Sequence, residues 1–181
     1  MWVIGFGTLL LKHSLGDTVG GEVSDQKKYV PITVNGYKRL FNVRAEHYTP
    51  SHKVSDRDNE IGAANVEFSP MHSFNGVAFE VDDSELELLD TRERYYERIE
   101  VDANYFDTGL PLGEACVYCA MPDSKWVENN NEKLLPHWRD IDYARRGAYA
   151  IGDNFGRAYD ESTFMADGKT LMVDFYQNFI D

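Results

Sequence analysis

The sequence predicts an α+β fold with a mixed or antiparallel sheet. Short apolar or alternating stretches, typical of strands, recur along the first two-thirds of the chain. Helical spacing appears between these stretches and again near the C-terminus. The chain has 181 residues, 43% hydrophobic and 13% aromatic, which is enough to bury a core. We therefore expect residues 1–181 to form a single domain.

The expected strands are separated by turn signals. Asn35-Gly36 lies between two apolar runs and is typical of a tight turn, so Tyr29–Leu40 is predicted to form a hairpin, extended by Phe41–Val43. The polar segments 46–60 and 122–136 are predicted to be loops, and 102–113 a linker. Further strands are expected at Trp2–Ile4, Ala63–Phe68, Gly76–Val81, Tyr96–Val101 and Glu114–Met121.

A helix is predicted in the middle of the chain, over about residues 85–94. Asp82 and Asp83 supply negative charge at its start, and Ser84 with Glu87 has the spacing of a capping box. Two further helices are expected, one from Trp138 to a stop at Gly152 and one over Asn154–Met165. The pattern of Leu171–Phe179 leaves strand and helix open.

The central helix carries a carboxylate on its apolar face. Leu86, Leu89 and Glu93 fall at i, i+3 and i+7, and Leu88 and Tyr95 widen the face. Burial would raise the pKa of Glu93, which suits a general acid or base near neutral pH. The alternative is a frayed helix end where Glu93 pairs with Arg94, Arg98 or another cation. Glu85, Glu87 and Arg92 are expected to lie mostly away from this face.

The charge balance argues against polyanionic partners. There are 18 Lys and Arg against 31 Asp and Glu, a formal net charge of −13, and no basic run is visible. Neither nucleic acid nor an anionic membrane is therefore expected as a partner. Met1–Leu11 is apolar but lacks the positive flank and cleavage site of a signal peptide, so it is expected to be a core strand and turn. With only two cysteines, a cytoplasmic location is favoured.

No metal site is expected. Cys116 and Cys119 form a CxxC within an apolar strand, where residues three apart face opposite ways, so they are expected to be structural. A zinc or thiol site there is the weaker alternative. The acids of loop 46–60 lack the glycine of a calcium loop. The histidines are scattered and expected to be solvated: His13, His47, His52, His72 and His137.

A glycine-rich turn follows the first strand. In Gly5-Phe6-Gly7-Thr8 two glycines flank an aromatic residue, and the third glycine of a dinucleotide-binding fingerprint is replaced by Leu10. The glycines allow the backbone to approach a ligand closely. An ordinary tight turn is the alternative on these residues alone.

The glycine turn and the segment that contains Glu93 follow each other in the same order as two motifs of a known superfamily. Gly5–Leu9 resembles the YGSN(L) or YGTL signature of the γ-glutamylcyclotransferase superfamily, which includes the ChaC-like and AIG2-like proteins, and Leu89–Glu93 resembles its LDxxE motif. The resemblance covers most of residues 1–121. Two strands also match: Gly36–Phe41 resembles GYxRxF, and Gly76–Val81 resembles GVxYEV.

The resemblance implies a fold, a reaction and a site. The fold is a small mixed β-barrel flanked by helices. The reaction is the attack of a γ-glutamyl α-amine on its own γ-carbonyl, which gives 5-oxoproline and a free amine, amino acid or dipeptide, as in glutathione metabolism, with no metal or organic cofactor. Glu93 would be the general acid/base, and Tyr118 would contact the substrate. The glutamyl group would bind the turn formed by Gly5, Phe6, Gly7, Thr8 and Leu9.

The sequence departs from the superfamily pattern at two places. Phe6 replaces the usual tyrosine, and Arg94 follows Glu93 where a glycine often stands. These departures support an alternative function on the same fold, a non-catalytic module that binds a small molecule or a protein.

Overall fold

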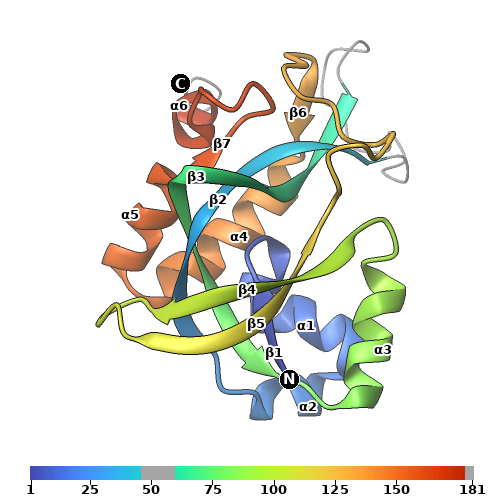
Figure 1. Ribbon diagram of the computed structural model, residues 1–181, viewed down its shortest axis with the longest axis vertical. Helices are drawn as coiled ribbons and strands as arrows, with labels where there is room; N and C mark the ends of the chain where they lie inside the picture. Colours follow the sequence, from blue (N-terminus) through green and yellow to red (C-terminus); the bar gives the residue numbers. More distant parts are fainter. Residues whose placement is uncertain (46–59, 178–181) are drawn as a thin grey trace.

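The computed structural model describes residues 1–45 and 60–177, which contain a closed β-barrel (Figure 1). The sheet has the strand order β6-β3-β1-β5-β4-β2-β7, and β2 pairs in addition with β3, so that five of these strands close a ring. β1 runs parallel to β5, whereas the other pairs within the ring are antiparallel. The barrel strands are β1 (Trp2–Gly5), β2 (Val30–Arg44), β3 (Glu60–Glu80), β4 (Glu97–Tyr105) and β5 (Pro111–Cys119). The predicted α+β fold with a small mixed barrel is confirmed.

Two long strands replace shorter predicted ones. The hairpin predicted at Tyr29–Leu40 is wrong, because β2 runs through Asn35-Gly36 as one strand. Its register against β3 shifts between Asn35 and Tyr37, and Gly36 adopts φ +82°. The turn signal is thus used in a bulge, which bends a strand and allows a sheet to close. The strands predicted at Ala63–Phe68 and Gly76–Val81 likewise belong to the single strand β3.

The second half of the barrel has short connections. β4 and β5 extend into the predicted linker 102–113 and leave only a tight turn between them. The predicted loop 122–136 contains a short strand, β6 (Leu134–Pro136), and β7 (Thr163–Phe164) pairs with β2. Most of the loop predicted at 46–60, with its faint calcium-loop spacing, lies outside the described residues.

Helices lie around both ends of the barrel (Figure 1). α4 ends before Gly152 as predicted, and the next helix stops four residues earlier than expected, at Glu161. The short helices before Gln26 were not expected. None of the described helices is long and apolar enough to cross a membrane. The helices are η1 (Thr8–Leu10), α1 (Lys12–Val19), α2 (Gly21–Gln26), α3 (Asp83–Arg92), α4 (Trp138–Ile151), α5 (Asp153–Glu161) and α6 (Met172–Gln177).

The cap of α3 differs from the predicted one. Asp82 Oδ1 accepts from Glu85 N at 2.9 Å, and Glu85 Oε2 accepts from Asp82 N at 2.8 Å. The predicted capping box of Ser84 and Glu87 is therefore wrong. Glu85 was expected to lie away from the core, yet it is buried, because Lys27 Nζ lies 2.6 Å from its carboxylate.

The outer face of α3 also differs from the prediction. Leu89 is fully buried, but Leu88 and Tyr95 are 48% and 38% exposed. They do not widen the apolar face as expected.

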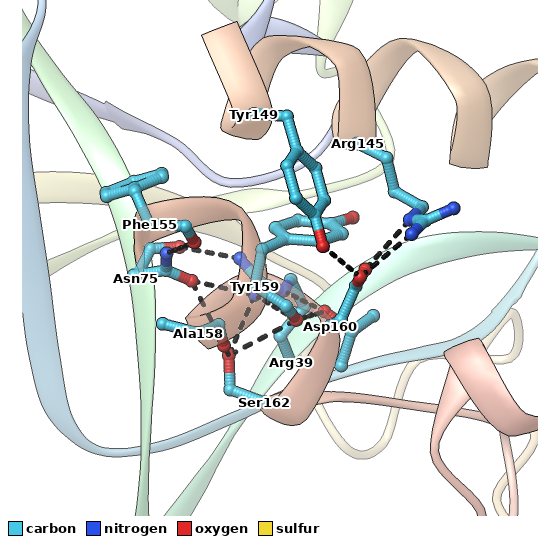
Figure 2. Close-up of polar contacts among 10 residues, drawn as sticks. Arg39, Asn75, Arg145, Tyr149, Phe155, Ala158, Tyr159, Asp160 and Ser162 are labelled. Atoms are coloured by element: carbon cyan, nitrogen blue, oxygen red, sulfur yellow. Dashed lines mark hydrogen bonds and ion pairs between the residues drawn. The ribbon is translucent and has the colours of Figure 1, made fainter. Parts of the chain in front are cut away.

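A buried arginine ties the C-terminal elements to the barrel (Figure 2). Arg39 of β2 is fully buried and donates to Asn75 of β3, to the Tyr159 carbonyl and to the Ser162 hydroxyl. Its guanidinium also lies 3.8 Å from the centre of the Tyr159 ring. Burial lowers the pKa of Arg39 to about 10. The carbonyls and the aromatic face compensate the buried charge and fix α5 against the barrel.

Candidate functional site

A pocket of about 310 Å³ opens between the barrel, η1, the end of α3 and the start of α4. This volume lies at the lower end of the range for small-molecule sites. The walls are mainly apolar, with two carboxylates and one guanidinium among them. The lining residues are Ile4, Phe6, Gly7, Thr8, Leu9, Phe41, Ala63, Ala64, Arg92, Glu93, Tyr96, Tyr118, Asp140 and Ala144.

Of the seven residues singled out in the sequence, six line this pocket and Gly5 does not. Gly5 ends β1, and a Cβ added there would lie 2.8 Å from the Leu9 Cβ. Its lack of a side chain thus lets the chain fold back closely on itself, rather than admit a ligand. The first hydrogen bond of η1 runs from Leu10 N to the Gly7 carbonyl, so that this turn does not use the N–H groups of Thr8 and Leu9.

Three side chains hold the glycine turn in place. The Tyr29 hydroxyl donates to the Leu9 carbonyl at 2.9 Å, and Arg39 donates to the Phe6 carbonyl at 3.4 Å. Arg92 donates to Thr8 Oγ1 at 3.2 Å. Since Thr8 Oγ1 accepts this bond, its own O–H remains available to donate into the pocket.

Glu93 lies where α3 ends. It is the C-cap residue, and its N–H donates to the Leu89 carbonyl at 2.8 Å. Its side chain is 19% exposed, and Oε1 lies 3.0 Å from Arg92 Nε. Burial raises the pKa of Glu93, and this effect outweighs the opposite influence of Arg92. The arrangement gives the pocket a carboxyl group that is easier to protonate than an exposed one.

The cation beside Glu93 is Arg92. Arg94 instead stacks over Tyr95, with its guanidinium 4.9 Å from the ring centre. Arg98 pairs with Asp90 at 3.0 Å. Of the partners that the alternative interpretation allowed, which were Arg94, Arg98 or another cation, the structure shows the last, at the C-terminal end of α3.

Tyr118 lies on β5 and faces the same pocket. Its hydroxyl donates to Asp90 Oδ1 at 2.7 Å. Burial, with the added effect of Asp90, raises the pKa of Tyr118, so the phenol stays protonated. Because its proton is committed to Asp90, the phenol oxygen can act only as an acceptor towards the pocket.

Sequence reasoning missed three polar lining residues. Arg92 was expected to lie away from the buried face, although its position next to Glu93 was a usable signal for a counter-ion. Asp140 lies in the first turn of α4, and nothing in its local sequence indicated a site. Tyr96 follows the helix and donates from its hydroxyl to the Ala64 carbonyl at 3.0 Å.

The cysteines and histidines lie outside this pocket where they are described. Cys116 and Cys119 belong to two different buried clusters, as strand alternation predicts. In the described part of the chain, no three His, Cys, Asp or Glu side chains are grouped to hold a metal. His137 was expected to be solvated, but it is buried and accepts from Arg139 N at the start of α4. His47 and His52 lie outside the described residues.

No protein-family model matches the chain, and no curated protein matches it. Solved structures do. A γ-glutamyl cyclotransferase has a TM-score of 0.64 and 17% identity, over 88% of this chain and 85% of its own. An uncharacterised human protein has the same TM-score and identity, over 87% and 85% of the two chains. A yeast γ-glutamyl cyclotransferase specific to glutathione has a TM-score of 0.52 and 13% identity, over 82% and 77%. The chain therefore has the γ-glutamylcyclotransferase-like fold.

Proposed function

We propose that this protein is a γ-glutamylcyclotransferase-like enzyme of the lyase class. It would convert a small γ-glutamyl compound to 5-oxoproline and release an amine, amino acid or dipeptide. The observation that carries the proposal is the half-buried Glu93 carboxyl, placed in one pocket with the Phe6–Leu9 turn.

The chemistry requires a base and then an acid. The α-ammonium of the substrate gives one proton to Glu93, and the free amine attacks the γ-carbonyl carbon to form the ring C–N bond. The ring nitrogen then loses a second proton to solvent, which leaves the single N–H of the lactam. The protonated carboxyl then gives the proton to the leaving nitrogen as its bond to the γ-carbon breaks. General acid/base catalysis of this kind typically raises the reaction rate by about 10²–10⁴-fold. A raised pKa favours both transfers near neutral pH.

The other polar groups of the pocket fit the remaining parts of the substrate. The N–H groups of Thr8 and Leu9 and the Thr8 hydroxyl are donors, suited to the α-carboxylate or to the oxyanion that develops on the γ-carbonyl. The Tyr118 oxygen is an acceptor, suited to the α-ammonium. Holding both ends of the substrate makes the five-membered ring closure effectively unimolecular.

The rival function is a non-catalytic binding module on the same fold. It is favoured by Phe6, which offers no hydroxyl, and by the ion pair of Glu93 with Arg92, which engages one carboxylate oxygen. The two functions differ in what Glu93 does, because a binding module can retain its ligand when this carboxylate is neutralised.

The test is 5-oxoproline release from a panel of γ-glutamyl amines, γ-glutamyl amino acids and glutathione. Wild type is compared with Glu93→Gln and with Glu87→Gln, a matched control on the exposed face of α3. We expect release from wild type and the control, and a loss of at least about 10²-fold in Glu93→Gln. No release from a folded wild type on any substrate would overturn the proposal, and ligand binding unaffected by Glu93→Gln would then establish the rival.

A further inference from the structure

Among the described residues that line the pocket, Arg92 is the single cation, and its side chain is 25% exposed. A guanidinium in a small-molecule pocket invites the interpretation that it binds a substrate carboxylate. The contacts of Arg92 argue against that interpretation.

The two terminal nitrogens of this guanidinium carry four N–H groups, and all four have protein acceptors. Nε forms an ion pair with Glu93 Oε1, 3.0 Å away. The first terminal nitrogen donates to the Ser14 carbonyl at 2.5 Å and to Thr18 Oγ1 at 2.8 Å. The second donates to Thr8 Oγ1 at 3.2 Å and to Ser14 Oγ at 2.9 Å. Four of the five donors of the arginine are thus hydrogen-bonded within the protein and the fifth nitrogen, Nε, lies against Glu93, which leaves no terminal N–H for a ligand.

These acceptors come from three parts of the chain. Glu93 ends α3, Thr8 begins η1, and Ser14 and Thr18 belong to α1. The planar fork of donors holds them in one fixed geometry, which a lysine with its single nitrogen cannot reproduce. Arg92 therefore couples the proposed base to the turn proposed to bind the glutamyl group.

We infer that Arg92 is a positioning residue, which orients the Glu93 carboxylate and the Thr8 hydroxyl relative to each other and does not bind the substrate. The expected effect on kcat rests on the proposed function. The orientation of Glu93 and Thr8 by Arg92 does not depend on that function. Arg92 leaves one Glu93 oxygen, Oε2, for the proton transfers, and it turns the Thr8 proton towards the pocket.

A titration that needs no turnover tests the geometric part. The Glu93 carboxyl carbon is followed by ¹³C NMR against pH, with its signal identified by its loss in Glu93→Gln. In Arg92→Met we expect the midpoint to move to higher pH, because the neighbouring cation is gone. Thr18→Val is the matched control, since it removes one Arg92 acceptor remote from the pocket and should leave the midpoint unchanged. The other ionisable groups lining the pocket, Tyr96, Tyr118 and Asp140, are the same in all variants.

Kinetics separate positioning from substrate binding. We expect Arg92→Met to lower kcat for 5-oxoproline release by about 10- to 100-fold with little change in KM. Arg92→Lys should restore the titration midpoint of Glu93 but not kcat. If Arg92→Met does not fold, Arg92→Lys is used in its place. A KM rise with unchanged kcat would overturn the inference, as would an unchanged midpoint in a folded Arg92→Met. If wild type releases no 5-oxoproline, the proposed function fails while the titration still decides the role of Arg92.

Discussion

The hydroxyl of Tyr118 donates to the carboxylate of Asp90 at 2.7 Å, across the gap between β5 and the last turn of α3. Asp90 is held in turn by Arg98 of β4 at 3.0 Å. The phenol of this pocket-lining residue is thereby fixed in orientation.

Tyr118→Phe removes this hydroxyl and leaves Asp90 with one partner fewer. We expect kcat/KM for 5-oxoproline release to fall by about 10-fold and the free energy of unfolding to fall by about 1 kcal/mol. Steady-state kinetics and urea unfolding measure the two effects. Tyr105→Phe, on an exposed tyrosine of β4, is the control and should change neither. Wild-type kinetics in Tyr118→Phe would contradict a substrate contact at this oxygen.

Glu93 should make stability depend on pH in a defined direction. Burial raises the pKa of Glu93 above its ordinary value of 4.5, so the folded state binds this proton more tightly than the unfolded chain. The stability that the group contributes is therefore present below that value and is lost as pH rises to the folded pKa. Urea unfolding of wild type and Glu93→Gln over a pH series measures it. We expect wild type to lose stability relative to Glu93→Gln across this interval, and a difference independent of pH would contradict a buried carboxyl.

The start of α3 offers a direct comparison of two glutamates. Glu85 closes the capping box with Asp82 and pairs with Lys27, whereas Glu87 lies on the exposed face. Glu85→Ala should lower the free energy of unfolding by about 2 kcal/mol, since it leaves a poorly exposed Lys27 without its partner. Glu87→Ala should change it by no more than about 0.5 kcal/mol. Equal effects in chemical denaturation would favour the box of Ser84 and Glu87 instead.

Gly5 controls how closely η1 can fold back on β1. A Cβ at this position would lie 2.8 Å from the Leu9 Cβ and 3.1 Å from the Leu9 carbonyl, so the turn that lines the pocket must shift. Gly5→Ala is expected to destabilise the protein by about 2 kcal/mol. Gly21→Ala is the control, because no atom lies within 4 Å of a Cβ placed there. It should be neutral or stabilising by up to about 1 kcal/mol in thermal unfolding.

The parts of this fold that could be predicted are those with local causes. The helical spacing of Leu89 and Glu93 identified a carboxylate on a buried face, and Gly152 correctly marked the end of α4. The α+β class followed from the alternation of strand and helix patterns. These signals depend on neighbours within one or two turns of the chain.

The parts that could not be predicted depend on partners far apart in the sequence. Asn35-Gly36 has the same local signal in a hairpin turn and in a bulge, and only the long partner strand β3 selects the bulge. Glu85 is buried because its carboxylate pairs with Lys27, which lies 58 positions earlier in the chain. α1 has weak helical residues, including Gly16, and is held by the buried Leu15. The Arg92 side chain is held at the pocket by hydrogen-bond acceptors that lie up to 84 positions away in the sequence.

Arg39 has a consequence for the order in which the protein can assemble during synthesis. Its buried guanidinium donates to Tyr159, Ser162 and Thr163, which are made at least 120 residues later. The same side chain reaches the Phe6 carbonyl beside the pocket. Until residues 159–163 have been made, β2 carries a cation without these acceptors. A nascent chain that ends before α5 therefore contains all five strands of the ring and the residues given above for the pocket lining, but its buried guanidinium still lacks the acceptors that the C-terminal elements supply.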